Sequence, residues 1–302
     1  MSTHKYLHDN RNDQILIYVN GEILHREKAK ISVFDSGFLL GDGVWEGIRF
    51  HNRHLVFIQE HLDRLFQGAS SLDIDIGISK DNIKSLIISV LNANRMVTDI
   101  HIRLIVSRGL KKTPYQHPNA NLGGATIVII PEYKKADKTI NKKGISLVTV
   151  STRRGTADTQ DPQLNTLSKL NCIFACIEAD KKGADEGLMM DVNGNVSTCN
   201  STNFFIIKNK EVWTSTGEYC LPGVTRGAII QLCKENNIPI YEKDFLVADV
   251  LNADEAFVTG TFAGVIPAVS LDGKTIGNGK RGPMTETFFN LYKNKIEKLY
   301  PS

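Results

Sequence analysis

Residues 151–179 read STRRGTADTQDPQLNTLSKLNCIFACIEA, and this stretch decides the fold of the chain. It begins as the end of a strand and continues as a polar loop around Asp161 and Pro162. Apolar side chains then recur at the spacing of a helix: Leu167, Leu170, Ile173, Phe174 and Ile177. We therefore predict a helix over residues 165–182, with an apolar stripe along one face and Lys169 at the edge of that stripe.

Composition places the chain among ordinary globular proteins. Its 302 residues, 41% of them hydrophobic and 23% charged, suffice for one large or two medium domains. The net charge is +3 and basic residues never run longer than a pair, which argues against a nucleic-acid-binding surface. No apolar run approaches the roughly 20 residues of a membrane helix. The polar N-terminus MSTHKYLHDNRND lacks the apolar segment of a secretory signal, so we expect a cytoplasmic protein.

The cysteines of the chain indicate neither a disulfide framework nor a metal site. They are five in number, and none belongs to a zinc-like CxxC pair. Cys172 and Cys176 lie one helical turn apart, where we expect them to act as small buried hydrophobic residues. Reduced thiols agree with a cytoplasmic location, and we expect no bound metal ion.

Strands and helices alternate along the chain without a run of βαβ units. After residues 15–19, Asn20-Gly21 supplies the positive φ angles of a hairpin turn. Further strands are expected at residues 100–108, 125–130, 145–150, 187–191, 203–207 and 256–259, and further helices at residues 57–69, 81–93, 225–236 and from about 283. The lysine-rich residues 134–144 suit a linker. We therefore predict an α+β fold of two domains, residues 1–133 and 145–302.

Four glycines punctuate the stretch SVFDSGFLLGDGVWEGIRF at residues 32–50: Gly37, Gly41, Gly43 and Gly47. Glycine permits tight turns and lets another part of the molecule approach the backbone closely. Taken alone, the pattern favours a structural role, and the close approach of another part of the molecule is the alternative.

Seven motifs occur in a fixed order along the chain: FDSGFLLGDGVWEGIR (34–49), EHLDRL (60–65), IRLIVSRG (102–109), KGADEGLMMDVNG (182–194), LPGVTR (221–226), ADEAFVTGTFAG (253–264) and PAVSLDG (267–273). Together with the stretch 151–179, they resemble the class IV (fold type IV) pyridoxal-phosphate aminotransferases, the branched-chain and D-amino-acid aminotransferase family. The resemblance covers roughly residues 15–290. It implies a two-domain, D-amino-acid aminotransferase-like fold with an interdomain active-site cleft, pyridoxal 5′-phosphate as cofactor, and a homodimer.

The resemblance implies that Arg64 contributes to a phosphate cradle. Arg64 lies on a predicted helix, and its guanidinium fork suits phosphate oxygens. The alternative is an ion pair with Asp63 or Glu60 on the same helix.

Two further pieces of the implied cradle come later in the chain. Gly223, Val224 and Thr225 stand at the start of a predicted helix, where exposed N–H groups and the helix dipole favour an anion. The alternative is an ordinary helix start with Thr225 as its N-cap. Thr261, followed by Phe262, offers a hydroxyl and an N–H group, and a simple turn at the end of a strand is the alternative.

Two positions depart from the pattern of the family. Asn165 occupies the position of the lysine that forms the Schiff base, and a carboxamide neither condenses with an aldehyde nor acts as a general base. The segment VSTCNSTNFF (196–205) resembles V-T-E-G-x-x-x-N-x-F and has Thr198 at the glutamate that faces the pyridine nitrogen. A neutral hydroxyl stabilises a pyridinium less than a carboxylate does.

Lys169 is the candidate catalytic amine. On a helix it lies four residues after Asn165, on nearly the same face and about 6 Å further along the axis, within reach of a long side chain. The alternative is a solvated helix lysine. Asn165 itself is then either a polar group that bonds the ligand or a helix N-cap.

Trp45, Arg103 and Arg108 are the candidate substrate residues. Trp45 takes a position where relatives often carry Phe or Tyr, which gives an apolar wall. Both arginines lie on the strand predicted at residues 100–108, and Arg108 resembles a carboxylate-binding arginine of D-amino-acid enzymes. Ordinary ion pairing between strands is the alternative for both.

The leading hypothesis is an aminotransferase-like enzyme that binds pyridoxal phosphate and acts on a small, branched-chain-like amino acid or its 2-oxo acid. One alternative is an enzyme of the same scaffold that works without a Schiff base, as a lyase, isomerase or hydrolase. A homologue that binds ligands without catalysis is the other.

Overall fold

The structure is a computed structural model that describes residues 8–137 and 139–301. The contacts divide these residues into two compact units. The N-terminal unit comprises residues 8–135, 164–169 and 300–301, and the C-terminal unit comprises residues 136–163 and 170–299. The chain thus returns to the N-terminal unit at residues 164–169. The predicted linker at residues 134–144 divides the chain only once and places these residues in the second domain.

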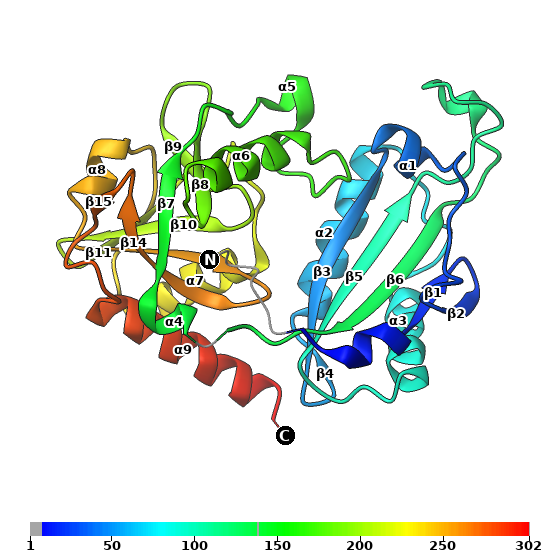
Figure 1. The fold of residues 1–302 in the computed structure, drawn as a ribbon, viewed down its shortest axis with the longest axis horizontal. Helices are drawn as coiled ribbons and strands as arrows, with labels where there is room; N and C mark the ends of the chain where they lie inside the picture. The colour runs from blue at the N-terminus through cyan, green and yellow to red at the C-terminus, as the bar shows by residue number, and fades with distance from the viewer. Residues whose placement is uncertain (1–7, 138, 302) are drawn as a thin grey trace. The chain divides into compact units, whose positions relative to one another are not determined.

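A six-stranded antiparallel sheet forms the centre of the N-terminal unit, in the order β2-β1-β6-β5-β3-β4 (Figure 1). Its strands are β1 (Leu16–Val19), β2 (Glu22–His25), β3 (Gly43–His51), β4 (His54–Leu55), β5 (Ile100–Ser107) and β6 (Thr126–Tyr133). Its helices are η1 (Asn10–Gln14), α1 (Ser36–Leu40), α2 (Ile58–Ser71), α3 (Lys80–Ala93) and η2 (Pro118–Ala120). The hairpin predicted at Asn20-Gly21 is confirmed, since these residues have φ angles of 45° and 103° between β1 and β2.

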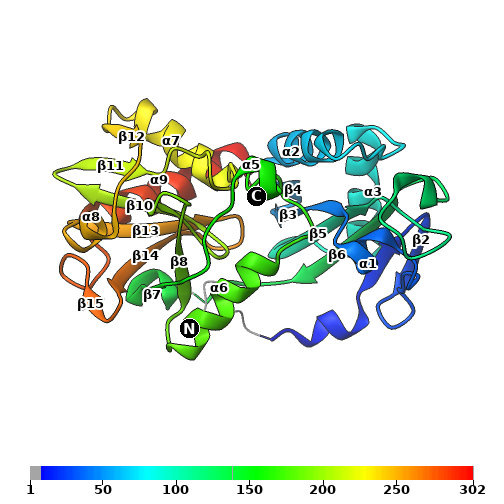
Figure 2. The same ribbon diagram turned by 90° about the horizontal axis from the view of Figure 1, so that it is seen from above.

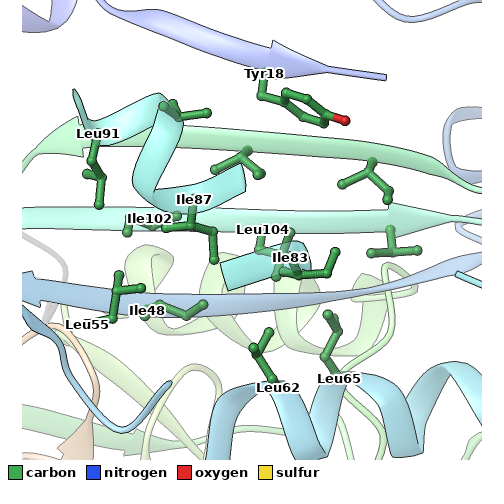
Figure 3. Packing of buried hydrophobic residues seen from close by; sticks show 14 of the residues in the cluster. Tyr18, Ile48, Leu55, Leu62, Leu65, Ile83, Ile87, Leu91, Ile102 and Leu104 are labelled. Atoms are coloured by element: carbon green, nitrogen blue, oxygen red, sulfur yellow. The ribbon is translucent and has the colours of Figure 1, made fainter. Parts of the chain in front are cut away.

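One face of this sheet is buried under α2 and α3, which lie on the same side of it (Figure 2). Leu62 and Leu65 of α2 and Ile83 of α3 pack against Ile48 and Leu104 of the sheet (Figure 3). Successive strand residues point to opposite faces, so every second residue of β3 and β5 points away from these helices.

A nine-stranded sheet forms the centre of the C-terminal unit, in the order β12-β11-β10-β13-β14-β7-β8-β9, and β15 pairs with β14. Its strands are β7 (Ile145–Thr149), β8 (Glu186–Met190), β9 (Val196–Cys199), β10 (Asn203–Lys208), β11 (Glu211–Thr214), β12 (Ile240–Glu242), β13 (Glu255–Gly260), β14 (Gly264–Leu271) and β15 (Lys274–Thr275). Its helices are α4 (Ile140–Lys143), α5 (Ala157–Gln160), α6 (Leu170–Lys181), α7 (Val224–Glu235), α8 (Val247–Leu251) and α9 (Pro283–Leu299). No described helix combines the length and the apolar character needed to cross a membrane.

Helix α6 differs from the prediction in where it starts. It begins at Leu170 rather than at residue 165. It packs on β8 through small residues, Ala175 and Ala179, and a Cβ on Gly187 of β8 would lie 2.9 Å from the Ala175 carbonyl oxygen. The larger apolar residues of the predicted stripe are exposed on this helix: Leu170, Ile173, Phe174 and Ile177.

The expected burial of the two cysteines on α6 is wrong. Cys176 is exposed and Cys172 is half-buried, because the helix turns its alanines rather than its thiols toward β8. The cysteines that are buried lie elsewhere in the C-terminal unit: Cys199, Cys220 and Cys233.

Candidate active site

In the N-terminal unit, the extended segment around Asn165 pairs with β3 through main-chain hydrogen bonds, in the manner of a short antiparallel strand. The main-chain N–H of Trp45 donates to the Asn165 carbonyl oxygen at 3.0 Å, and the N–H of Leu167 donates to the Gly43 carbonyl oxygen at 2.9 Å. Asn165 is therefore extended rather than helical. The predictions that Asn165 caps a helix and that Lys169 shares a helix face with it are both wrong, because α6 begins only after Lys169.

Other parts of the same unit approach the glycine-rich stretch closely: Val106 and Ser107 of β5, and also Leu167 and Ser168. A Cβ on Gly43 would lie 2.7 Å from Leu167 Cδ1, and one on Gly37 would lie 3.0 Å from the same atom. A Cβ on Gly41 would lie 3.0 Å from Ser168 Oγ. The glycines thus make room for the segment that carries position 165.

The carboxamide of Asn165 serves as a clamp on β3. Its Nδ2 donates to the Trp45 carbonyl oxygen at 2.6 Å. This bond fixes the orientation of the amide, so that Oδ1 points away from the Trp45 carbonyl group. The residue is 5% exposed, and Oδ1 has no hydrogen-bond partner among the described residues. A buried amide oxygen of this kind is an acceptor for a water or for an N–H or O–H group of a ligand.

The indole of Trp45 lies close to two cations. The Arg103 guanidinium carbon is 3.6 Å from the ring centroid and Lys169 Nζ is 5.8 Å from it, both within the range of cation–π attraction. Arg103 has no hydrogen-bond or ion-pair partner among the described residues. Burial lowers the pKa of its guanidinium, and Glu132 and Glu46 oppose this only in part. A guanidinium in this state is suited to binding a carboxylate.

Arg108, in contrast, is occupied by structural contacts. Its Nε and Nη2 donate to the two carboxylate oxygens of Asp42 at 2.7 and 3.0 Å. Nη1 and Nη2 also donate to the main-chain carbonyl oxygens of Asp73 and Leu72, at 2.9 and 2.7 Å. Although burial opposes ionisation, the bonds from Arg108 hold the pKa of Asp42 below its usual range. This geometry favours the structural alternative for Arg108, with Asp42 as its partner.

Arg64 of α2 is held by a carboxylate that the sequence motifs did not single out. Its Nε and Nη2 donate to the two carboxylate oxygens of Glu46, both at 2.7 Å, and His61 Nδ1 lies 2.7 Å from Glu46 Oε2. Asp63, one of the two partners predicted for Arg64 as the alternative, pairs with Lys80. Burial alone would raise the pKa of Glu46, but the bonds from His61 and Arg64 outweigh it and lower that pKa.

The signal for this pair was present in the alternation of β3. Glu46 lies between Val44 and Ile48 on the face covered by α2, where every second residue is buried. A carboxylate at such a position requires a buried partner from the covering helix.

Besides the predicted Lys169, the structure offers a second candidate amine, Lys134, which the sequence motifs did not indicate. It directly follows β6. Burial lowers the pKa of its amine, and the nearby charge of Arg103 lowers it further, while Glu132 opposes the shift. A lysine with a lowered pKa is a better nucleophile and base at neutral pH than a solvated one.

In the C-terminal unit, the predicted anion site lies at the start of α7. The helix begins at Val224, and its N-cap is Gly223, which has no side chain to accept the first N–H groups. Thr225 lies buried in the first turn, so the alternative that it is the N-cap is wrong. A Cβ on Gly223 would overlap Asn203 Oδ1. Main-chain N–H groups without a side-chain cap and the positive end of a helix dipole favour an anion.

The remaining predicted residues of this unit are Thr198, Thr261 and Phe262. Thr198 is buried on β9, and its hydroxyl donates to the Thr202 carbonyl oxygen at 2.8 Å. Its oxygen can therefore only accept a further hydrogen bond. Thr261 and Phe262 are half-buried in the short turn between β13 and β14.

The sequence model of the amino-transferase class IV family matches residues 43–271. The chain belongs to the class IV aminotransferases. It is 39% identical over 286 residues to the branched-chain-amino-acid aminotransferase-like protein 1 of Arabidopsis thaliana, a match that covers 95% of this chain and 51% of that protein. It thus spans about half the length of this relative. A putative branched-chain-amino-acid aminotransferase of Methanocaldococcus jannaschii is 35% identical over 279 residues, with 92% and 95% covered.

The fold agrees with this class IV aminotransferase assignment. The crystal structure of the Escherichia coli branched-chain amino acid aminotransferase matches with a TM-score of 0.87 at 28% identity, over 93% of this chain and 94% of that one. The family and the mixed α and β architecture of fold type IV, both predicted from the sequence, are confirmed.

Proposed function

We propose that the chain is an aminotransferase-like enzyme that binds pyridoxal 5′-phosphate and acts on a small amino acid or its 2-oxo acid. The observation that carries this proposal is the start of α7, where Gly223 leaves the first-turn N–H groups without a side-chain cap. A phosphate at this position accepts from the N–H groups of Val224 and Thr225 and is favoured by the helix dipole. Thr261 is proposed as a further hydrogen-bond donor to the phosphate. A contribution of Arg64 to phosphate binding is proposed only on the family resemblance.

The ring-binding residues of the proposal are Thr198 and Phe262. Because the Thr198 hydroxyl already donates to the Thr202 carbonyl oxygen, it offers only an acceptor to a ligand. Such an acceptor suits a protonated ring nitrogen. When bound, pyridoxal phosphate would supply an electron sink for the α-carbon of an amino acid. A hydrogen bond to a hydroxyl is weaker than one to a carboxylate, so this chain would stabilise the protonated ring less than a glutamate does.

We propose Lys169 as the amine that moves the substrate proton. Asn165 cannot do this, and its carboxamide is engaged with Trp45. The proposal is supported by the Lys169 Nζ, which lies 5.8 Å from the Trp45 ring centroid. Lys134, with its lowered pKa, is the competing amine.

Arg103 is proposed to bind a carboxylate of the substrate, with Trp45 as the wall beside it. The proposal is supported by a half-buried guanidinium that lacks an ion pair in the described part of the chain. Arg108 is left out of the proposed substrate site, because four hydrogen bonds to Asp42, Leu72 and Asp73 already occupy it.

The test is uptake of pyridoxal 5′-phosphate by the purified protein, followed in the visible spectrum before and after borohydride. We expect saturable uptake, and peptide mapping of the reduced protein should find the label on Lys169 rather than Lys134. The label should be lost in Lys169→Ala and regained at position 165 in Lys169→Ala/Asn165→Lys. A protein that takes up no pyridoxal phosphate overturns the proposal.

A second candidate function is an enzyme of the same scaffold that works without a Schiff base. The observation that favours it is the Asn165 carboxamide, which stands at the position of the Schiff-base lysine but hydrogen-bonds to Trp45 of β3 and cannot form a Schiff base. Turnover that persists after complete removal of the cofactor would support this candidate. Tight ligand binding without turnover of any amino acid or 2-oxo acid would instead indicate a non-catalytic homologue.

The homodimer is likewise a proposal. It is supported by the exposed apolar residues of α6, of which Phe174 is 53% exposed in the single chain. Phe174→Asp should then shift the molecular mass in light scattering from that of a dimer to that of a monomer. The cytoplasmic location stays a prediction from the sequence.

A further inference from the structure

The carboxyl group of Glu186 is buried at the first residue of β8, and two hydroxyl groups bond it. Ser201 Oγ donates to Oε1 at 2.8 Å, and Thr202 Oγ1 donates to Oε2 at 2.7 Å. The residue is only 1% exposed. Neither hydroxyl belongs to a regular element, since both lie in the turn at residues 199–203 that joins β9 to β10.

The same turn is attached to β8 by its main chain. The N–H of Gly187 donates to Asn200 Oδ1 at 2.7 Å, and the N–H of Asn200 donates to the Gly187 carbonyl oxygen at 3.1 Å. Within the turn, the N–H of Cys199 donates to the Thr202 carbonyl oxygen at 2.9 Å. Glu186 and its neighbour Gly187 therefore anchor the whole turn.

Two candidate ligand contacts of the C-terminal unit depend on this turn. At one end, the hydroxyl of Thr198 is directed by its bond to the Thr202 carbonyl oxygen. At the other end, Asn203 Nδ2 donates to the Leu221 carbonyl oxygen at 3.0 Å, and its Oδ1 fills the space beside Gly223. A movement of the turn would redirect the Thr198 hydroxyl and shift the cap of α7.

We propose that Glu186 is a positioning residue, which holds the turn at residues 199–203 and through it sets the direction of the Thr198 hydroxyl and the position of the α7 cap. Its ionised form accepts both hydroxyl bonds, as in the structure. Its protonated form carries a donor on one oxygen, so that one of the two hydroxyls has to turn around. The inference rests on the proposed function insofar as the ligand is pyridoxal phosphate.

Both forms of Glu186 are populated near neutral pH. Burial raises the pKa of its carboxyl group to about 7, against the opposing bonds from Thr202 and Ser201. The titratable groups on neighbouring elements that feel its charge include the thiols of Cys199 on β9 and Cys176 on α6. Burial and the charge of Glu186 raise the pKa of both thiols, so the thiols keep their protons while Glu186 titrates. On β7, the residue paired with Glu186 is the apolar Leu147.

The test compares the full chain with Glu186→Gln between pH 6 and pH 8. The amide of Gln keeps the shape of the side chain, does not titrate, and supplies a donor where one of the hydroxyls needs an acceptor. The affinity for pyridoxal 5′-phosphate is measured by fluorescence titration, and the ratio of wild-type to variant affinity cancels the titration of the probe itself. If only the ionised form binds, this ratio falls about tenfold from pH 8 to pH 6. Cys176→Ser is the matched control and should titrate as the wild type does.

A second measurement needs no ligand. Amide hydrogen exchange at Cys199 and Asn200 should be faster in Glu186→Gln than in the wild type, and the wild type should approach the variant as the pH falls to 6. Ser201→Ala removes one of the two hydrogen bonds to Glu186 and should give a smaller increase in exchange at the same residues. This variant replaces Glu186→Gln in the experiment if Glu186→Gln does not fold.

The two measurements separate the two proposals. Equal exchange in all proteins overturns the role of Glu186, whether or not the cofactor binds. Faster exchange together with an affinity ratio that does not change with pH overturns the link to the ligand site. If pyridoxal phosphate binds to none of the proteins, the proposed function fails, and the exchange data still decide whether Glu186 holds the turn.

Discussion

Asn165 and Trp45 bond each other twice across two strands: the Trp45 N–H donates to the Asn165 carbonyl oxygen, and Asn165 Nδ2 donates to the Trp45 carbonyl oxygen. One bond uses only the main chain, and any residue could make it. The other requires a side chain with a donor at short reach. The residue at the position of the Schiff-base lysine is thus part of the packing of the N-terminal unit.

We expect Asn165→Ala to lower the free energy of unfolding by about 1–2 kcal/mol, because the Trp45 carbonyl oxygen loses its side-chain donor. Asn165→Asp should cost more, since it brings a carboxylate against the same carbonyl oxygen. Urea unfolding measures both. Gln163→Ala, at an exposed position two residues earlier, is the control and should stay within about 0.5 kcal/mol of wild type. An Asp variant as stable as the Ala variant would contradict the clamp.

Removing the carboxylate of Glu46 should destabilise the protein strongly. In Glu46→Gln the half-buried Arg64 guanidinium loses a buried, charged partner, and we expect a loss of about 3 kcal/mol in the free energy of unfolding. The control is Asp63→Asn on α2, the helix of Arg64, which breaks the exposed pair with Lys80 and should change the free energy of unfolding far less. Equal effects of the two variants in denaturant unfolding would argue against a buried ion pair at Glu46.

Two glycines one turn apart should respond differently to alanine. In Gly223→Ala the new Cβ overlaps Asn203 Oδ1 and displaces the cap of α7, so the affinity for pyridoxal 5′-phosphate should fall about tenfold or more, which is about 1.4 kcal/mol. Gly227 lies in the same helix with open space around its Cβ position. Gly227→Ala should therefore leave the affinity unchanged and stabilise the helix by about 1 kcal/mol. Titration with the cofactor and thermal unfolding check the pair.

Arg103 and Arg108 should separate into a binding residue and a structural one. Arg103→Gln removes a half-buried charge without an ion pair, so the free energy of unfolding should stay equal or rise, while the affinity for a 2-oxo acid falls by about 2 kcal/mol. Arg108→Gln removes the partner of Asp42, so stability should fall. Calorimetric titration and denaturant unfolding measure the two effects. A loss of stability in Arg103→Gln would count against its assignment.

The stability of the protein should depend on pH through Glu186. Its folded-state pKa of about 7 lies above the ordinary value of 4.5, so the folded protein binds a proton that the unfolded chain releases between these values. The stabilisation is complete below about pH 4.5 and is lost as the pH rises toward 7, by about 3 kcal/mol in total. Glu186→Gln should abolish this part of the pH dependence. Unfolding at pH 5 and pH 8 in both proteins measures the difference, and equal slopes would exclude the assignment.

Several parts of the structure were predictable because their causes are local. The hairpin at Asn20-Gly21 needs only two residues that tolerate positive φ. Helix α2 follows from its apolar spacing, and its start at Ile58 is close to the predicted residue 57. The glycine-rich stretch also indicated tight backbone turns with a close neighbour, although the segments that approach it were not predicted.

The candidate site was predictable only in part. The sequence pointed to the start of α7 because a glycine before a helix has the same meaning in any fold. It did not reveal that Glu46 is the partner of Arg64, since 18 residues separate them and only the packing of α2 on β3 joins them. The occupation of Arg108 by Asp42 spans 66 residues and was hidden for the same reason.

The sequence by itself determined the family, the turns and the helical and extended periodicities, because these depend on residues within a few positions of each other. Only the tertiary structure decided that residues 165–167 are extended and that α6 begins at Leu170. Apolar spacing favours a helix there, but the donor and acceptor groups of β3, which is about 120 residues away along the chain, offer this segment a partner that local sequence does not contain.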